Sequence, residues 1–281
     1  MSPPSEIFAP DALAGRVALV TGGGTNLGKQ AAIELVAGGA HVVIAGRREE
    51  VLAAAADEIG ERCSYVAGDV REAADATRMV DAARERHGRL DVLVNNAGGQ
   101  YFVPAEEIAA KGWEAVQRLN VGGTYSMTRA AVGGGFGEDG GTVINVTVSP
   151  HHGMPAMAHT GAARAAVEAL TRELATEWAD RRIAVVAAAI GRFDTESLRK
   201  YPEVVWRGAA RSVPLQRLGT MQEFGWLIVL LAGPLGHALS GSVVTLDGGA
   251  DNWWGPWPPP SITDDAGTVP TEERRSPASS P

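Results

Sequence analysis

The stretch Val17–Lys29 constrains the fold of this chain more than any other part of it. Four apolar residues, Val17–Val20, indicate a buried strand. The glycines Gly22–Gly24 then allow a tight turn, and the pattern Gln30–Val36 predicts a helix with one apolar face. A strand, a turn poor in side chains and a helix N-terminus together form an anion site, because backbone N–H groups and the helix dipole point at the same gap.

A glycine-rich turn is weak evidence by itself, since 35 of the 281 residues are glycine. The spacing Thr21-Gly22-x-x-x-Asn26-Leu27-Gly28 is more specific, because it resembles the Thr-Gly-x-x-x-Gly-x-Gly signature of the short-chain dehydrogenase/reductase family. Asn26 stands where that family has a glycine, and asparagine tolerates the positive φ that the turn needs. The residues predicted to contact a dinucleotide here are Thr21, Gly22, Gly24, Thr25, Asn26, Leu27 and Gly28.

Length and composition bound the remaining possibilities. We predict one NAD(P)-binding domain over residues 1–258 and a disordered Pro- and Ser-rich tail over 259–281. The net charge of −8, with no basic block, disfavours a nucleic-acid or anionic-membrane partner. The chain has no apolar run of about 18 residues and no signal-peptide pattern in its first residues, so we expect a cytoplasmic protein. The single cysteine, Cys63, excludes an intrachain disulfide, and no metal site is predicted.

Two arginines follow the predicted second strand, His41–Ala45. Dinucleotide folds that select NAD carry an acidic residue at this point, whereas Arg47 and Arg48 suit a 2′-phosphate. The cofactor is therefore predicted to be NADP(H); the alternative is that both arginines are simply solvated. After the next strand the family resemblance implies that Asp69 binds the adenine amino group and that Val70 packs on the ring.

The tetrapeptide Asn95-Asn96-Ala97-Gly98 follows the predicted strand Leu90–Val94 and is a second motif of the family. The resemblance implies that Asn95 ties the central strands together, while Asn96, Ala97 and Gly98 border the cofactor. Two motifs in the right order predict an α/β fold of the doubly wound (Rossmann) type, a three-layer sandwich with a seven-stranded parallel sheet. The family's last strand usually builds a subunit interface, which implies a homotetramer or, as the alternative, a homodimer.

A further cofactor segment follows the predicted strand Ile183–Ala189. Ile190, Gly191 and Thr195 stand where the family has Pro-Gly-x-x-x-Thr, so the resemblance implies that they contact the carboxamide or the pyrophosphate. The segment Ser197–Arg211 is interpreted as the mobile loop over the substrate.

The catalytic pattern of the family is broken in this chain. The family opens its catalytic helix, here predicted over Gly161–Trp178, with Tyr-x-x-x-Lys, whereas this chain has Thr160 and Arg164 at those positions. No tyrosine lies between residues 126 and 200. Carbonyl reduction needs an acid to protonate the new alkoxide, and a threonine hydroxyl is too weak an acid for that step. An ordinary alcohol dehydrogenase is therefore disfavoured.

A subgroup of the family that lacks this tyrosine reduces C=C bonds conjugated to thioesters. The segment His159–Ala165 resembles that subgroup, in particular the peroxisomal trans-2-enoyl-CoA and 2,4-dienoyl-CoA reductases. Such a reaction needs donors at the thioester oxygen and a proton for the α-carbon. The candidate catalytic residues are Asn120, Thr147, Ser149, Thr160, Arg164 and His159. The resemblance implies that Arg164, also a cofactor ligand, holds the nicotinamide ribose and that the backbone carbonyl of Asn120 holds a water.

Some assignments stay open at this stage. The family's catalytic serine aligns with Val148 counted along the strand and with Thr147 counted back from Arg164. His151, His152 and His159 are either proton donors or solvated loop residues, and Tyr101 is an outlying candidate for the acid. We therefore carry three hypotheses for a small-molecule substrate: NADPH-dependent reduction of an enoyl thioester or enone, carbonyl or alcohol turnover through a histidine or water relay, and NADP(H) binding with little redox activity.

Overall fold

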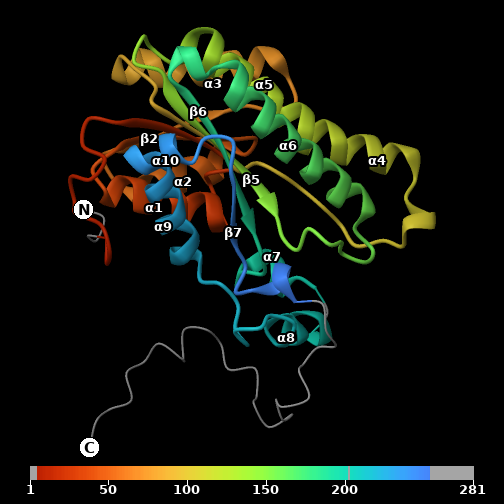
Figure 1. Cartoon of the computed structure of the whole chain (residues 1–281). Helices are drawn as coiled ribbons and strands as arrows, with labels where there is room; N and C mark the ends of the chain where they lie inside the picture. Colours follow the sequence, from red (N-terminus) through yellow and green to blue (C-terminus); the bar gives the residue numbers. More distant parts are fainter. Residues whose placement is uncertain (1–4, 202, 254–281) are drawn as a thin grey trace, which may run out of the picture.

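The computed structural model describes residues 5–201 and 203–253, and its described strands form one parallel sheet (Figure 1). The strand order is β3-β2-β1-β4-β5-β6-β7. The strands are β1 Val17–Thr21, β2 His41–Gly46, β3 Cys63–Ala67, β4 Val92–Asn95, β5 Gly141–Val148, β6 Ile183–Ile190 and β7 Val243–Leu246. The predicted seven-stranded doubly wound sheet is confirmed. Its order reverses between β1 and β4, which is where such sheets bind ligands.

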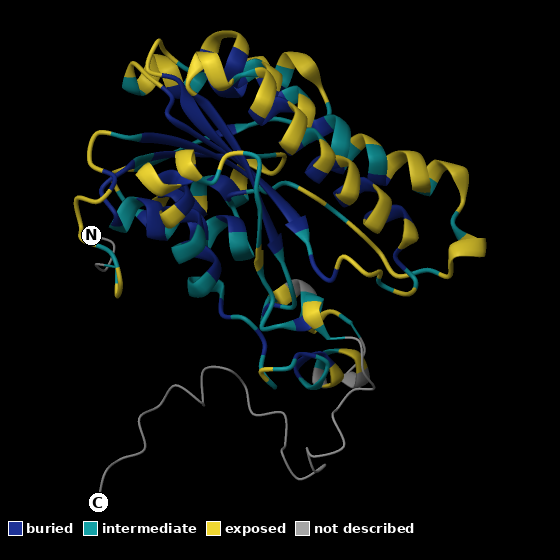
Figure 2. Ribbon diagram, in the orientation of Figure 1, coloured by how far each residue is buried: buried dark blue, intermediate teal, exposed yellow. Residues whose placement is uncertain are grey.

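Helices cover both faces of the sheet. The helices are α1 Asn26–Ala37, α2 Glu49–Ile59, α3 Ala73–His87, α4 Ala110–Gln117, α5 Gly123–Ala130, α6 Ala158–Glu177, α7 Glu196–Arg199, α8 Glu203–Arg211, α9 Met221–Ala232 and α10 Pro234–Ala238. Helices α1, α2 and α9 pack in one core and α3, α5 and α6 in the other, while α7 and α8 lie beyond the strand ends (Figure 1). Figure 2 shows the sheet as a buried layer between helices whose outer faces are exposed.

The strands carry apolar side chains on both faces, as the run Val17–Val20 predicts. Ala18 and Val20 of β1 belong to the core beneath α1 and α9, whereas Leu19 between them belongs to the core beneath α3 and α5. Adjacent residues therefore face opposite layers, which is the period of two that a strand requires. A chain with this pattern must cover both faces of its sheet.

A buried amide network joins the last residue of β4 to the middle of the neighbouring strand β5. Asn95 donates from Nδ2 to Asn145 Oδ1 on β5 and to Thr128 Oγ1 on α5, both at 2.9 Å. Asn145 in turn donates to Thr171 Oγ1 of α6 at 2.9 Å. The role expected for Asn95 is therefore confirmed, and the network fixes α5 and α6 relative to the strands that border the site.

Several predicted boundaries are wrong, each for a local reason. The first helix begins at Asn26 rather than Gln30, because Thr25 is its extended N-cap and Gly28 is accommodated inside the first turn. The catalytic helix begins at Ala158, three residues before the predicted start. The segment expected to be a mobile loop, Ser197–Arg211, consists largely of α7 and α8. The Pro- and Ser-rich tail over 259–281 and the domain end at 258 lie outside the described residues and stay predictions.

Within the described residues, no helix is long and apolar enough to cross a membrane. Cys63 lies in β3, and burial raises its pKa to about 12, so the thiol is unreactive at neutral pH.

Helix α9 begins with a capping box that gives a stability prediction. Thr220 Oγ1 accepts from the backbone N–H of Glu223 at 3.2 Å, and the Glu223 carboxylate accepts from the N–H of Thr220 at 2.8 Å. Replacing Thr220 by alanine leaves one partly buried N–H donor without its acceptor, so we expect the free energy of unfolding to fall by about 1 kcal/mol in chemical denaturation. Thr176→Ala, at an exposed position of α6, is the control, and equal losses in both variants would refute the prediction.

Candidate active site

The turn between β1 and α1 has the shape that a dinucleotide phosphate requires. Gly22 has φ +65°, and Asn26 has φ 46°, so asparagine does adopt the positive φ expected of it. A Cβ on Gly28 would lie 2.3 Å from the Gly22 carbonyl oxygen, which shows how closely the helix approaches the strand end. The Asn26 side chain is turned to α7, where its Oδ1 accepts from the Glu196 N–H at 3.1 Å. The turn Gly22–Gly28 therefore forms a cradle whose backbone N–H groups can hold a pyrophosphate.

Thr21 and Asn96 hold this turn against the one that follows β4. The Thr21 hydroxyl accepts from the N–H groups of Asn96 and Ala97, each at 3.0 Å, and donates to the Val94 carbonyl. The Asn96 amide donates to the Thr21 carbonyl at 2.9 Å. Both predicted cofactor residues thus act within the chain as positioning groups. They keep the two turns side by side at the switch point of the sheet.

The adenosine end carries a cation that sequence reasoning missed. Arg47 and Arg48 are exposed at the end of β2, as a 2′-phosphate site requires. Both carboxylate oxygens of Asp69 accept from Arg71, and these hydrogen bonds lower the pKa of Asp69. Val70 is buried against Gly123, where a Cβ would lie 2.8 Å from its side chain. The Asp-x-Arg spacing after the third strand was the available sequence signal for Arg71.

Arg164 brings a buried cation to the other end of the cradle. It is 8% exposed and donates from Nη1 to the Val146 carbonyl at 2.7 Å, while its Nε has no hydrogen-bond partner. A Cβ on Gly98 would lie 2.3 Å from its Nη2 and 2.8 Å from Asn120 Oδ1, so Gly98 makes room for both side chains. Burial lowers the pKa of Arg164 to about 10, which leaves it charged at neutral pH. No ion pair to Arg164 is found among the described residues.

Asn120 lies in a π-helical turn, Arg118–Gly122, between α4 and α5. Its side chain donates to the carbonyls of Gly99 (2.9 Å) and Val116 (2.8 Å). Its own carbonyl, the group expected to hold a water, accepts from Thr124 Oγ1 at 2.8 Å. Such single π-turns are frequent at functional sites.

The first two turns of α6 concentrate buried polar atoms that lack hydrogen bonds. His159 and Thr160 are both 0% exposed, and neither ring nitrogen of His159 nor the Thr160 hydroxyl has a partner. With Arg164 Nε included, four buried polar atoms without a hydrogen-bond partner lie between residues 159 and 164 of α6. The interpretation of His159 as a solvated loop residue is therefore wrong. Buried polar groups without partners need an explanation, and a polar ligand or water seated here would supply one.

Tyr101 borders the same helix turn. Its ring meets that of His159 edge-on, with 4.5 Å between the ring centroids, and is 39% exposed. Its hydroxyl oxygen packs on Gly112 of α4, where a Cβ would lie 2.1 Å away. Phe102, next to it, contacts the ring of Tyr201 beyond α7, with 4.8 Å between centroids. Aromatic side chains thus line the approach to His159.

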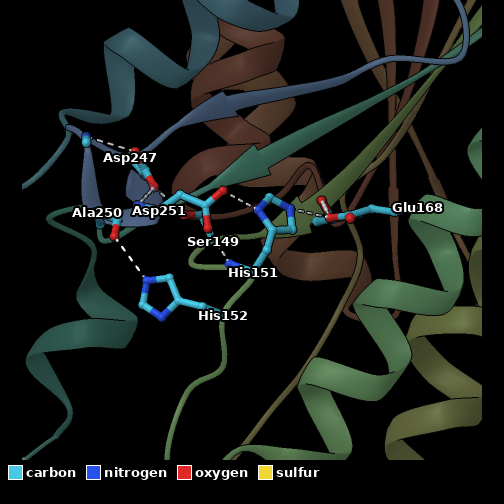
Figure 3. Close-up of polar contacts among 9 residues, drawn as sticks. Ser149, His151, His152, Glu168, Asp247, Ala250 and Asp251 are labelled. Carbon is cyan, nitrogen blue, oxygen red and sulfur yellow. Dashed lines mark hydrogen bonds and ion pairs between the residues drawn. The ribbon is translucent and has the colours of Figure 1, made fainter. Parts of the chain in front are cut away.

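The hydroxyls of Thr147 and Ser149 are each hydrogen-bonded to a carboxylate, and Figure 3 draws Ser149 beside its partner Asp247. Thr147 donates to Glu168 Oε1 at 2.8 Å, and the Ser149 hydroxyl donates to Asp247 at the end of β7. The sequence predicts that these hydroxyls donate or relay protons at the substrate, and that role stays a prediction; in this structure both hydroxyl protons are directed at carboxylates. Glu168 was missed by sequence reasoning, although a carboxylate four residues after Arg164 on a buried helix face was a usable signal.

The segment after β6 closes the cradle. Ile190 ends β6, and a Cβ on Gly191 would lie 2.6 Å from Asp247 Cβ, so only glycine fits there. Thr195 caps α7 by accepting from the Leu198 N–H at 3.2 Å. The structure therefore brings the predicted cofactor residues to one edge of the sheet and sets Arg164, His159 and Thr160 beside them.

Comparison with known proteins identifies the family. The family model described as short chain dehydrogenase matches residues 16–205. The chain belongs to the short-chain dehydrogenase family. A peroxisomal 2,4-dienoyl-CoA reductase of Pongo abelii is 36% identical over 252 residues, covering 87% of this chain and 86% of that protein. A probable 2,4-dienoyl-CoA reductase of Bacillus subtilis is 33% identical, covering 86% of this chain and 98% of that protein.

Solved structures agree with this assignment. The citronellol catabolism dehydrogenase AtuB of Pseudomonas aeruginosa superposes with a TM-score of 0.79 at 36% identity, covering 89% of this chain and all of that one. The RhlG/NADP active-site complex of the same organism superposes with a TM-score of 0.80 at 33% identity, covering 87% and 100%. This short-chain dehydrogenase is therefore an oxidoreductase whose family uses a nicotinamide cofactor, and its relatives include enzymes named as dienoyl-CoA reductases.

Proposed function

We propose that this short-chain dehydrogenase is an NADPH-dependent reductase of an activated C=C bond, in an enoyl thioester or an enone. The observation that carries the proposal is the start of α6. Thr160 and Arg164 stand in place of the phenol and the lysine, and they join His159 in a buried group of unpaired polar atoms. Relatives named for dienoyl-CoA reduction support the same reaction class.

The residues suit conjugate reduction. NADPH, when bound on the cradle from Gly22 to Gly28 and beside Gly98, would supply a hydride to the β-carbon. Arg164 then offers positive charge to the thioester oxygen, where negative charge collects, and its burial strengthens that interaction. His159 can hold a proton on one ring nitrogen for the α-carbon. Thr147 and Glu168 support the strand end behind this group.

The choice of NADPH is testable at Arg47. Replacing Arg47 by alanine removes a cation from the end of β2, so we expect the KM for NADPH to rise by about tenfold, the equivalent of one charge-assisted hydrogen bond. The KM for NADH should not change, because NADH has no 2′-phosphate. Arg84→Ala, at an exposed position of α3, is the control for loss of surface charge. Equal effects on NADPH and NADH would contradict the proposal.

The reaction class is tested by following NADPH consumption at 340 nm with crotonyl-CoA and with a panel of ketones. Turnover of crotonyl-CoA with little on the ketones supports the proposal. Turnover of the ketones with little on crotonyl-CoA favours carbonyl reduction. Two observations support that alternative: the contact between Tyr101 and His159, and a relative, 34% identical, named as a 3-oxoacyl-[acyl-carrier-protein] reductase. Tight NADPH binding with no turnover on either substrate class favours a binding protein.

We further propose that the protein is a homotetramer, with a homodimer as the alternative, and that it works in the cytoplasm. Sedimentation velocity tests the assembly.

A further inference from the structure

The ring of His151 lies between two carboxylates that come from different parts of the chain (Figure 3). His151 belongs to the loop 149–157, which joins β5 to α6. Its Nε2 is 3.0 Å from Glu168 Oε1 on α6, and its Nδ1 contacts Asp251 of the short 3-10 helix η5, Ala250–Asn252. The backbone N–H of His151 also donates to Asp251. One side chain thus links three segments.

The two carboxylates are themselves held in place. Glu168 Oε1 also accepts from Thr147 at the end of β5. Asp247, at the end of β7, accepts from the N–H of Asp251 at 2.7 Å and from the Ser149 hydroxyl. Both partners of His151 are therefore fixed by groups of the sheet, so the ring anchors the loop to a rigid frame.

The far end of the same loop reaches the catalytic turn of α6. The Ala156 carbonyl accepts from the Val103 N–H at 2.9 Å, which joins the loop to the segment carrying Tyr101. The Met157 carbonyl accepts from the N–H groups of Thr160 (3.0 Å) and Gly161 (2.9 Å). The loop therefore runs from the His151 anchor to the residues proposed to meet the substrate, and its position sets one wall of that site.

Two carboxylates contact His151 and favour its protonated form, Glu168 from α6 and Asp251 from η5. Asp247 lies behind Asp251, and the neighbouring His152 has its Nε2 3.3 Å from the Ala250 carbonyl. Partial burial lowers the pKa of His151, but the hydrogen bond to Asp251 and the charge of Glu168 outweigh it, so the net pKa lies above 6.5. Burial raises the pKa of Asp251, and its hydrogen bonds from His151 outweigh that, so it stays ionised near neutral pH.

We propose that His151 is a positioning residue of this enzyme: as an imidazolium clamped between Glu168 and Asp251, it holds the loop 149–157 in the conformation that receives the acyl substrate. The inference rests on the proposed function for the substrate, but the clamp itself is a property of the chain. A group whose pKa is raised by folding contributes stability below its unfolded pKa and loses it as the pH rises through the folded pKa. The clamp is therefore complete below the ordinary histidine pKa of 6.5 and is lost as the pH rises through the higher pKa of folded His151.

The experiment compares wild type with His151→Gln and with Arg172→Gln, which removes an exposed cation of α6 outside this loop. Kinetics with crotonyl-CoA at pH 6.5 should show the KM raised about tenfold in His151→Gln, the scale of one lost charge-assisted contact, with kcat changed far less. The KM of wild type should climb towards that of the variant as the pH rises above the pKa of His151, whereas the KM of His151→Gln should be flat. Arg172→Gln should follow wild type.

Hydrogen exchange of the amides of residues 152–158, measured without substrate, separates this inference from the proposed function. The protection of these amides from exchange should be lower in His151→Gln than in wild type at pH 6.5. In wild type it should fall as the pH is raised into the alkaline range. Asp251→Asn, which keeps the size and one hydrogen bond, should lie between them. NADPH affinity and thermal unfolding report that each variant is folded. Unchanged protection in His151→Gln overturns the clamp whatever the substrate proves to be, and a protected loop with no crotonyl-CoA turnover overturns only the substrate class.

Discussion

Replacing Arg164 by methionine will lower kcat/KM for crotonyl-CoA by about 100-fold or more, the usual effect of removing one preorganised donor from a site of developing charge. The guanidinium is buried, donates to the Val146 carbonyl and has no carboxylate partner among the described residues. Its charge is therefore uncompensated until an anion or a developing enolate arrives. NADPH affinity should fall much less, because the cradle at Gly22 and Gly28 is untouched. Stopped-flow reduction and a separate NADPH titration measure the two effects.

Arg181→Met is the matched control, since that arginine also donates to a backbone carbonyl, of Val132 at 2.8 Å, but on the short helix after α6. It should keep the activity of wild type. A kcat/KM for Arg164→Met within twofold of wild type would show that Arg164 takes no part in the reaction.

The substitution Arg164→Lys tests the charge at this position through the pH dependence of activity. Burial lowers the pKa of Arg164 to about 10 from an ordinary value of 12.5. A lysine there starts from a pKa of about 10.4 and meets the same desolvation, so its pKa should fall further into the working range. Since the charged form is the active one, activity is lost as the pH rises through that pKa. The kcat of the lysine variant should therefore match that of wild type best at pH 6–7 and decline by pH 9, where the kcat of the arginine enzyme does not; parallel kcat profiles would count against the role of the charge.

The fold was predictable because its determinants are local. The run Val17–Val20, the glycines after it and the Asn95–Gly98 motif each lie within a few residues, and the order of such motifs along the chain defines a doubly wound sheet. Boundaries were less predictable, since the start of α6 at Ala158 depends on Met157, whose carbonyl accepts the first N–H groups and whose side chain is buried. Hydrophobic periodicity does not report a cap of that kind.

The site was only partly predictable, because its polar partners are distant in sequence. His151 and Asp251 are separated by 100 residues, and only the packing of β5, β6 and β7 brings them together. The burial of His159 is also a tertiary property, set by Tyr101 and the wall of α4 and not by its neighbours in the chain. Thr147 and Ser149 were identified as site residues, yet the carboxylates that accept their hydrogen bonds could not be predicted from the strand alone.

Replacing Gly28 by alanine will lower the affinity for NADPH by up to about 100-fold, because overpacking against backbone costs about 1–3 kcal/mol. Its Cβ would lie 2.3 Å from the Gly22 carbonyl oxygen and 2.5 Å from Asn96 Nδ2. The first contact is with the backbone of the turn itself, so relief requires the turn to open. An open turn no longer aims its N–H groups at the pyrophosphate. Fluorescence titration with NADPH measures the loss.

Two opposing effects make the outcome at Gly28 decisive. Alanine is favoured over glycine inside a helix by about 1 kcal/mol, so a substitution that only changed helix propensity would stabilise α1 and leave binding intact. Gly133→Ala is the control for helix propensity alone, because a Cβ at position 133 has nothing within 4 Å of it. This variant should bind NADPH as wild type does. If Gly28→Ala also binds normally, the close approach of α1 to the end of β1 is not what forms the cofactor site. If it folds and fails to bind, steric closure of the turn outweighs the gain in propensity, and the cradle depends on a single missing side chain.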